Sequence, residues 1–187
     1  MGDRHVDGGA YRGRFQRVGG GCRVKEPKAV DLAEGREPHA QYGALPWRIS
    51  DELEIMLLTS RGTRRWVIPK GWPMKGRKPN ATAAVEALEE GGLLGNIGKK
   101  SIGAYHYRKR LKNGAVLICR VEVFPLRVLR QRKKWLEMGQ RVTQWLPYSE
   151  AAKLVAEEEL KELILAFGRA LSATAEEGVI DTRPLLG

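Results

Sequence analysis

The sequence predicts a mixed β-sheet sandwiched by helices, which places the chain in the α/β class. Strand-like segments lie on both sides of one short helix, and two further helical segments come near the end of the chain. This order of elements suits a sheet with helices on both faces. With 187 residues and 42% hydrophobic content, the chain is long enough for one domain with a core of its own.

The chain divides into an arm, a domain and a tail. Residues 1–40 are rich in glycine and charge and lack periodicity, which predicts a disordered arm. Residues 41–172 contain the periodic segments and form the predicted domain, and residues 173–187 are expected to be a flexible tail. The arginines of the arm could bind nucleic acid, but acidic residues offset most of their charge, which favours a plain solvated segment.

Composition argues against a membrane or secreted protein. No run approaches the ~18 apolar residues of a membrane span, and no apolar segment follows the first charged residues as in a secretory signal. Cys22 and Cys119 are too few for a disulfide framework and have no cysteine or histidine at metal-binding spacing. We therefore expect a cytoplasmic protein without a membrane partner, and the sequence does not indicate the oligomeric state.

Apolar alternation and turn residues place the strands. Strands are predicted at residues 42–50, 53–60, 66–68, 97–109, 115–128 and 142–146. The continuous apolar run at 53–60 indicates a strand buried on both faces. Lys112-Asn113-Gly114 is a strong hairpin turn. A helix is expected to begin at Ser149, whose hydroxyl can cap it, and an amphipathic helix is expected at 157–171.

The stretch from Gly71 to Leu93 reads as a glycine- and proline-rich loop followed by the short helix. Pro79 and Asn80 open the helix, with Asn80 as the expected N-cap, and Gly91-Gly92 closes it. At helical spacing, one apolar stripe contains Ala81, Ala84, Val85 and Leu88. A narrow arc nearly opposite contains Glu86, Glu89 and Glu90. We therefore expect the apolar stripe to be buried and the three carboxylates to lie side by side on the other face.

This clustering of carboxylates is poor for helix stability. Like charges at i,i+4 repel, and acidic residues near a helix C-terminus oppose the macrodipole. A solvated acidic face is one interpretation. A site for a hard cation such as Mg²⁺ or Mn²⁺ is the other, because the cation would cancel the repulsion. The preceding loop favours the second, since Lys70, Lys75, Arg77 and Lys78 would suit a metal-bound polyphosphate.

Residues 71–93 resemble the signature of the Nudix hydrolases, G-x(5)-E-x(7)-R-E-U-x-E-E-x-G-U, in which U is a bulky apolar residue. The matching positions are Gly71, Glu86, Glu89, Glu90, Gly92 and Leu93. Ala87 is small where the pattern has a bulky residue. Arg77 stands in place of the first glutamate and Val85 in place of the arginine, so the pair that generally braces loop against helix in this family is absent. Trp66–Met74 and Tyr105–Tyr107 resemble, more specifically, bacterial relatives of the diphosphoinositol polyphosphate phosphohydrolases.

The resemblance implies a Nudix-type α/β/α sandwich with a loop–helix catalytic motif and hydrolysis of a diphosphate linkage. It implies that Glu86 and Glu90 hold Mg²⁺ (or Mn²⁺) with the carbonyl of Gly71, and that Glu89 completes the metal set or acts as the base. Phosphates of the substrate would be bound by Lys70, Lys75 and Lys78. The expected substrate is a dinucleoside polyphosphate, a nucleotide or an inositol pyrophosphate.

The charge distribution also favours a polyanionic small molecule. The net charge is +11, and the segments 61–80 and 99–112 contain seven and six basic residues, respectively, with no acidic residue. A generally basic surface is the plainer interpretation, and RNA is a possible but less favoured partner. The departures at Arg77 and Val85 keep a further alternative open, namely a catalytically weakened Nudix domain that acts as a nucleotide- or RNA-binding regulatory module.

Three single residues have two interpretations each. Trp72 could stack on a base, although packing is the commoner role of a tryptophan. His106 is expected to be an ordinary strand residue rather than a catalytic base. Glu137 lies in the polar loop at 131–141, where Nudix enzymes often supply another carboxylate, but a surface glutamate is slightly favoured.

Overall fold

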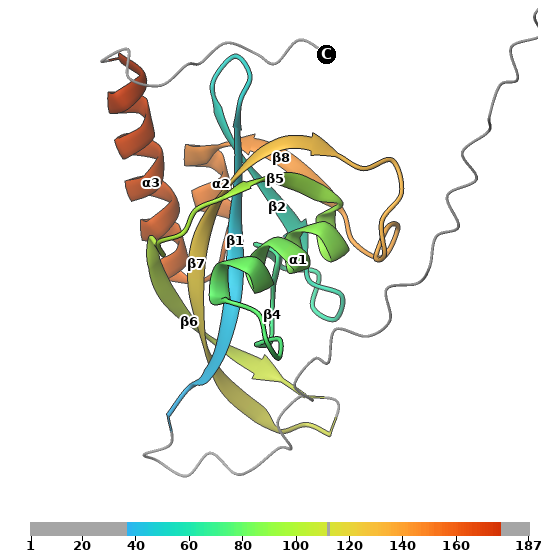
Figure 1. The fold of residues 1–187 in the computed structure, drawn as a ribbon. Coiled ribbons are helices and arrows are strands. Elements are labelled where there is room, and N and C mark those ends of the chain that lie inside the picture. Colours follow the sequence, from blue (N-terminus) through green and yellow to red (C-terminus); the bar gives the residue numbers. More distant parts are fainter. Residues whose placement is uncertain (1–36, 112, 177–187) are drawn as a thin grey trace, which may run out of the picture.

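The computed structural model describes residues 37–111 and 113–176 (Figure 1). In chain order, the elements are β1 (His39–Ile49), β2 (Leu53–Thr59), β3 (Trp66–Val67), β4 (Lys70–Gly71), α1 (Pro79–Gly91), β5 (Leu93–Ile97), β6 (Gly103–Arg110), β7 (Val116–Gln131), β8 (Thr143–Pro147), α2 (Tyr148–Leu154) and α3 (Glu158–Glu176). Most of the expected arm and most of the expected tail lie outside the described residues. The exceptions are the last residues of the arm, where β1 begins, and the first residues of the tail, where α3 ends.

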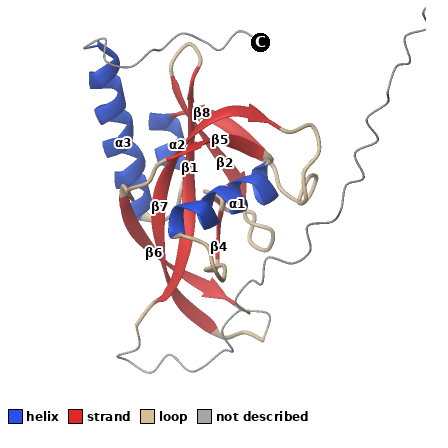
Figure 2. Cartoon of the chain, viewed as in Figure 1, coloured by secondary structure: helices blue, strands red, loops and turns tan. Residues whose placement is uncertain are grey.

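The strands form one mixed sheet. Its order is β3-β2-β1-β7-β5, with β4 beside β1, β6 beside β7 and β8 beside β2. The long central strands β1 and β7 are parallel, from His39 opposite Cys119 to Trp47 opposite Arg127, whereas the other pairs are antiparallel. Figure 2 shows α1 lying across the strands, with α2 and α3 away from it. The prediction of an α/β fold with a mixed sheet is confirmed.

Successive strand residues point to opposite faces, so the sheet has two cores. In β1, Ala44 faces α1 and packs with Ala83 and Ala87, while Leu45 belongs to the cluster that contains Ile164 of α3. The same alternation occurs in β2 and β7. Helices therefore cover both faces, as the sequence predicted.

The helix α1 begins differently from the expectation. Its N-cap is Lys78, which makes no side-chain capping bond, and Pro79 occupies the first turn. The prediction of Asn80 as the N-cap was wrong, because its amide Nδ2 donates to the carbonyl oxygen of Gly98, 3.3 Å away. The helix ends at Gly92, which has a left-handed conformation with φ of 70°, as the Gly-Gly pair predicted.

The buried face of α1 was also predicted wrongly. The stripe of Ala81, Ala84, Val85 and Leu88 is only half-buried. The buried residues are instead Thr82, Ala83, Glu86, Ala87, Glu90 and Gly91. A carboxylate can be buried when partners satisfy it, and Glu90 has such partners from two other segments. Apolar periodicity could not reveal this face because its largest side chains are acidic.

Five of the six predicted strands are present, the sixth differs, and β4 was not predicted. β2 is buried on both faces, as the apolar run indicated. The predicted single strand at 97–109 was wrong, because the structure has β5 before it and β6 within it. A loop separates β5 from β6, and within it the N–H of Gly98 donates to the carbonyl oxygen of Pro125 at 2.8 Å. The hairpin between β6 and β7 is confirmed: Asn113 accepts a bond from the N–H of Ala115, and Gly114 has φ of 85°. Lys112 lies outside the described residues.

The C-terminal helices agree with the prediction apart from one cap. α2 begins at Tyr148 after Pro147, which makes no side-chain capping bond, so Ser149 is not the cap. Proline is tolerated at the N-cap because the N–H that it lacks would take no part in the hydrogen bonds of the helix. No helix in the described part of the chain is long and apolar enough to cross a membrane.

Candidate active site

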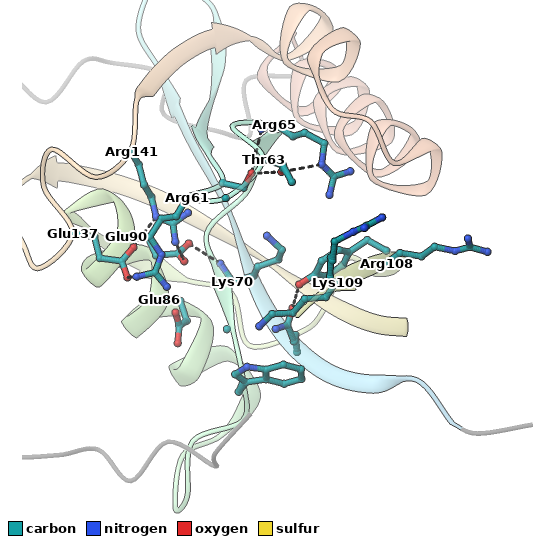
Figure 3. A pocket seen from close by; sticks show the side chains of 17 residues that line it. Arg61, Thr63, Arg65, Lys70, Glu86, Glu90, Arg108, Lys109, Glu137 and Arg141 are labelled. Atoms are coloured by element: carbon teal, nitrogen blue, oxygen red, sulfur yellow. Dashed lines mark hydrogen bonds and ion pairs between the residues drawn. The ribbon is translucent and has the colours of Figure 1, made fainter. Parts of the chain in front are cut away.

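A cavity of about 450 Å³ opens beside α1. It is bounded by the loop after β2, by β4, by α1, by the end of β6 and by the loop between β7 and β8. Figure 3 shows Glu86, Glu90 and Glu137 together at one side, and Arg65 and Arg108 away from them. Segments that are distant in the sequence thus place acidic and basic side chains around one space.

Glu86 is held against the backbone of β4. Its side chain is 2% exposed. A Cβ atom added at Gly71 would lie 2.1 Å from Oε1 of Glu86 and 2.6 Å from Oε2, closer than real Cβ atoms approach any atom. Position 71 therefore requires glycine for a steric reason, since any side chain would displace the Glu86 carboxylate.

Glu90 lies one helical turn further along and is 7% exposed. Its Oε1 accepts a short hydrogen bond from the guanidinium of Arg141, and its Oε2 accepts one from the backbone N–H of Lys70 at 3.2 Å. Burial raises the pKa of Glu90, while the charges of Lys70 and Arg141 oppose that shift. Glu90 thus connects α1 to β4 and to the loop after β7.

Glu137 is the third carboxylate of the cavity and is 8% exposed. Its Oε2 accepts a bond from Nε of Arg141 at 2.7 Å, and its Oε1 lies 3.3 Å from Nη1 of Arg61. The preference for a surface glutamate at this position was wrong. The side chain of Arg141, four residues further on, is itself buried and pairs with this carboxylate.

Lys70 lies opposite the carboxylates. Its ammonium is 5.2 Å from the ring centre of Tyr107, whose hydroxyl donates to Gln41 at 2.8 Å. Burial lowers the pKa of Lys70, and the nearby Glu90 carboxylate opposes this change. Burial also raises the pKa of the Tyr107 hydroxyl above its usual value.

Trp72 closes the cavity at the other end of β4. Its side chain is 9% exposed and packs with Leu117 and Cys119. The ammonium of Lys109 lies 4.5 Å from its ring centre, and His39 meets it edge-on. The packing interpretation of Trp72 fits these contacts, and the stacking of a base on it stays a prediction.

Known proteins share this sequence pattern and this fold. The chain is 26% identical over 143 residues to Nudix hydrolase 12, mitochondrial, of Arabidopsis thaliana, covering 72% of this chain and 70% of that protein. It is 27% identical over 138 residues to diphosphoinositol polyphosphate phosphohydrolase 3-alpha of Mus musculus, covering 72% and 77%. A scan against models of protein families finds no match.

Solved structures agree with these relatives. The Ap4A hydrolase binary complex of C. elegans superposes with a TM-score of 0.55 at 19% identity, covering 72% of this chain and 98% of that one. The chain is similar to Nudix hydrolases in both sequence and fold. The Nudix domain of Shewanella oneidensis NrtR, complexed with ADP ribose, has a TM-score of 0.54 at 14% identity, with 79% and 94% covered. These similarities in sequence and fold agree with the family predicted from residues 71–93.

The structure brings together only part of the site expected from the Nudix signature. Gly71, Glu86, Glu90 and Lys70 line the cavity. Glu89 does not line it and is half-buried, although its carbonyl accepts a bond from the N–H of Glu137 at 3.0 Å. The two other predicted phosphate-binding residues, Lys75 and Lys78, are exposed and lie outside the lining.

The departures from the signature have visible consequences. Arg77 is exposed, and its side chain has no ion-pair partner among the described residues. Val85 is half-buried. The guanidinium next to the carboxylates comes from Arg141 instead, outside the signature. His106 is also outside the cavity and hydrogen-bonds Glu159, as expected for an ordinary strand residue.

The donors at the acidic side fit a hard divalent cation by their chemistry. Carboxylate oxygens of Glu86 and Glu90 lie beside the backbone of Gly71, whose missing side chain leaves room for them. Within residues 37–111 and 113–176, however, no group of three His, Cys, Asp or Glu side chains is arranged to hold a metal ion. Figure 3 shows Arg141 between Glu90 and Glu137, and its guanidinium donates to both.

Basic residues outnumber acidic ones around the cavity. The lining contains three glutamates and seven basic residues, which are Arg61, Arg65, Lys70, Arg108, Lys109, Arg110 and Arg141. Like-charged walls of low dielectric focus the electric field, so the cavity attracts anions. Its acidic and basic parts together suit a ligand that carries several phosphates.

Proposed function

We propose that the chain is a Mg²⁺- or Mn²⁺-dependent pyrophosphohydrolase that cleaves a diphosphate linkage in a phosphate-rich substrate. The observation that carries this proposal is the pairing of Glu86 and Glu90 in a cavity whose other charged groups are mainly basic. Carboxylates suit a hard cation, and basic side chains suit the phosphates that accompany it. The Nudix hydrolases among the relatives support the same class of reaction.

Each acidic residue has a proposed role. Glu86, Glu90 and the carbonyl of Gly71 would hold the cation. The bound cation supplies Lewis-acid polarisation of the phosphoryl oxygens. Glu89 would complete the ligand set or act as the base for the attacking water, and either role requires it to reach the cavity that it does not line in this structure.

The basic residues would bind and orient the phosphates. Lys70 is the proposed contact nearest the carboxylates, because its backbone N–H already bonds to Glu90. Lys75 and Lys78, on the exposed loop, would hold phosphates further from the cleaved linkage. Removal of these charges is expected to raise KM most for the most highly phosphorylated substrate.

The names of the relatives support three substrate classes. One similar structure is an Ap4A hydrolase, one relative is a diphosphoinositol polyphosphate phosphohydrolase, and one similar domain is complexed with ADP ribose. We propose a dinucleoside polyphosphate, a nucleotide or an inositol pyrophosphate as the substrate of this chain. A cytoplasmic location is part of this proposal.

The alternative is a Nudix domain that binds a nucleotide or RNA with little turnover. The observation that favours it is the position of Arg141, which binds Glu90 where an active hydrolase would need a metal ligand. The exposed Arg77, in place of the first glutamate of the signature, points the same way.

The decisive experiment is hydrolysis of a substrate panel with and without Mg²⁺. The panel contains a nucleoside triphosphate, a dinucleoside tetraphosphate, ADP-ribose, an inositol pyrophosphate and a 5′-capped RNA, and release of phosphate or nucleotide is measured. Mg²⁺-dependent hydrolysis of one small molecule supports the enzyme. Binding without hydrolysis of any member supports the binding module.

Variants test the assignment of the carboxylates. Glu86→Gln and Glu90→Gln should each lower turnover by orders of magnitude, and Glu89→Gln should do so only if Glu89 takes the ligand or base role. Glu162→Gln, exposed on α3, is the matched control. If both cavity variants keep wild-type rates, the reaction occurs elsewhere on the protein.

A further inference from the structure

The side chain of Arg141 is a buried cation beside the carboxylates. It is 7% exposed, and its three nitrogens reach three different segments. Nη1 donates to the carbonyl of Thr59 in β2 at 3.0 Å, Nε donates to Glu137 at 2.7 Å, and Nη2 donates to Glu90. Because guanidinium is planar and its donors are fixed, this arrangement sets the separation and orientation of the two carboxylates.

Glu90, one of the two proposed metal ligands, and the neighbouring Glu137 have protein donors in this arrangement. Glu90 accepts from Arg141 and from the N–H of Lys70. Glu137 accepts from Arg141 on one oxygen and lies within ion-pair distance of Arg61 on the other. A divalent cation that binds Glu90 must therefore share an oxygen with one of these donors or replace it, and it must do so next to the positive charge of Arg141.

The entry of a free divalent cation is also opposed by the charge of the whole cavity. Its seven basic residues outnumber its three glutamates, so a free divalent cation enters against the field. A phosphate-bearing ligand changes the balance, because it is attracted by the basic residues and brings negative charge close to the cation. Mg²⁺ is commonly held by one or two carboxylates together with substrate phosphates.

We propose that Arg141 acts as the internal cation of the free protein, and that a divalent metal reaches Glu90 only together with a phosphate-bearing ligand. Arg141 is then a positioning residue that keeps the carboxylates apart from free metal and sets the order of binding. This inference rests on the proposed function, because it takes Glu86 and Glu90 as the metal ligands.

The test measures binding of Mn²⁺ to the full chain, using the paramagnetic signal of the free ion, with and without methylenediphosphonate. This diphosphate analogue cannot be hydrolysed. We expect the affinity for Mn²⁺ to rise at least ~10-fold with the analogue, after correction for the complex that the two form alone. Equally tight binding of Mn²⁺ in the absence of the analogue would overturn the proposal.

Two variants distinguish a specific effect of Arg141 from a general effect of positive charge in the cavity. Arg141→Gln should bind Mn²⁺ without the analogue at least ~10-fold more tightly than the wild type does. Arg65→Gln is the comparison, because it removes another positive charge from the lining of the cavity. This charge does not pair with Glu90 or Glu137, since Arg65 pairs with Glu157. Equal gains in the two variants would contradict a specific role of Arg141.

A further variant covers the case in which Arg141→Gln does not fold. Arg141→Lys keeps the charge but loses the planar fork, so its affinity for Mn²⁺ without the analogue should stay as low as in the wild type. A large gain in this variant counts against the internal-cation role, and the comparison of wild-type protein with and without analogue stands in any case.

The failure of this inference and that of the proposed function are distinguishable. If the wild type hydrolyses a substrate but binds Mn²⁺ equally well without the analogue, the hydrolase assignment stands and the role of Arg141 falls. If metal binding requires the analogue but no substrate is hydrolysed, Arg141 has the proposed role in a binding module.

Discussion

The helices on the two sides of the sheet meet it in different ways. α3 contributes large apolar side chains, among them Leu160 and Ile164, both fully buried. α1 contributes small ones, among them Ala83 and Ala87, also fully buried. Large side chains supply buried area, whereas small ones let a helix backbone come close to the strands. One face of the sheet therefore mainly stabilises the domain, and the other brings carboxylates to the edge of the cavity.

The largest expected effect concerns the stabilising face. Ile164→Ala should lower the free energy of unfolding by about 2–5 kcal/mol, because it leaves a cavity between α3 and the sheet. Turnover of the folded protein at low temperature should change little. Urea unfolding followed by circular dichroism gives the stability, and Leu136→Ala, at a side chain that is 71% exposed, is the control.

The corresponding change on the other face tests the close approach of α1. Ala87→Leu should cost about 1–3 kcal/mol through overpacking, and it should lower turnover as well because it pushes α1 and its carboxylates away from the sheet. Ala166→Leu makes the same change on the exposed side of α3 and should be nearly neutral. A stability loss without any loss of turnover would show that the distance of α1 does not control the site.

Gly71→Ala should change turnover much more than it changes the free energy of unfolding. The new Cβ would overlap the Glu86 carboxylate, which lies at the end of a flexible side chain and can move away. Turnover should therefore fall by about 10- to 100-fold, whereas the free energy of unfolding should change by about 1 kcal/mol or less. Gly62→Ala is the matched control, since no heavy atom lies within 4 Å of its added Cβ. Similar turnover in the two variants would contradict the contact.

The smallest expected effect concerns a polar contact that joins α3 to the sheet. The N–H of His106 in β6 donates to Glu159 at 2.6 Å and thereby lowers the pKa of that carboxyl. Its contribution to stability is thus present above the usual pKa of glutamate and is lost as pH falls through the lowered value. Because the group is exposed, Glu159→Gln should cost less than about 1 kcal/mol.

Thermal melts from pH 7 down to pH 3 measure this difference, which should shrink at the acidic end. Glu162→Gln, on the same helix with an exposed side chain, is the control. A cost that stays constant over this range would mean that ionisation of Glu159 is not its source.

Local patterns predicted the strands and helices better than they predicted the faces of those elements. β2, the hairpin at Asn113-Gly114 and the glycine end of α1 follow from apolar runs and turn residues. The buried face of α1 did not, because apolar periodicity assumes that charged side chains avoid the interior. Here Glu86 and Glu90 are both buried, and residues from other segments donate hydrogen bonds to the carboxylate of Glu90.

The same limit applies to the site. The signature from Gly71 to Leu93 indicated Glu86 and Glu90, since the residues lie close together in the sequence. Arg141 and Glu137 come from a polar loop without periodicity, and only the folded chain brings them to α1. Their one local signal is the spacing of four residues between a glutamate and an arginine, which is common on protein surfaces.

The parallel pairing of β1 with β7 has a consequence for how the domain folds. His39 pairs with Cys119 and Trp47 with Arg127, so the central ladder joins segments separated by most of the domain's sequence. Such a topology has a high contact order, and a large loop must close before the ladder gains any stability. During synthesis, β1 leaves the ribosome long before its main partner exists. Until β7 follows, the apolar side chains of β1 and β2 can pack only against the elements made earlier, which are β3, β4, α1, β5 and β6, and aggregation in the cell competes with folding during that interval.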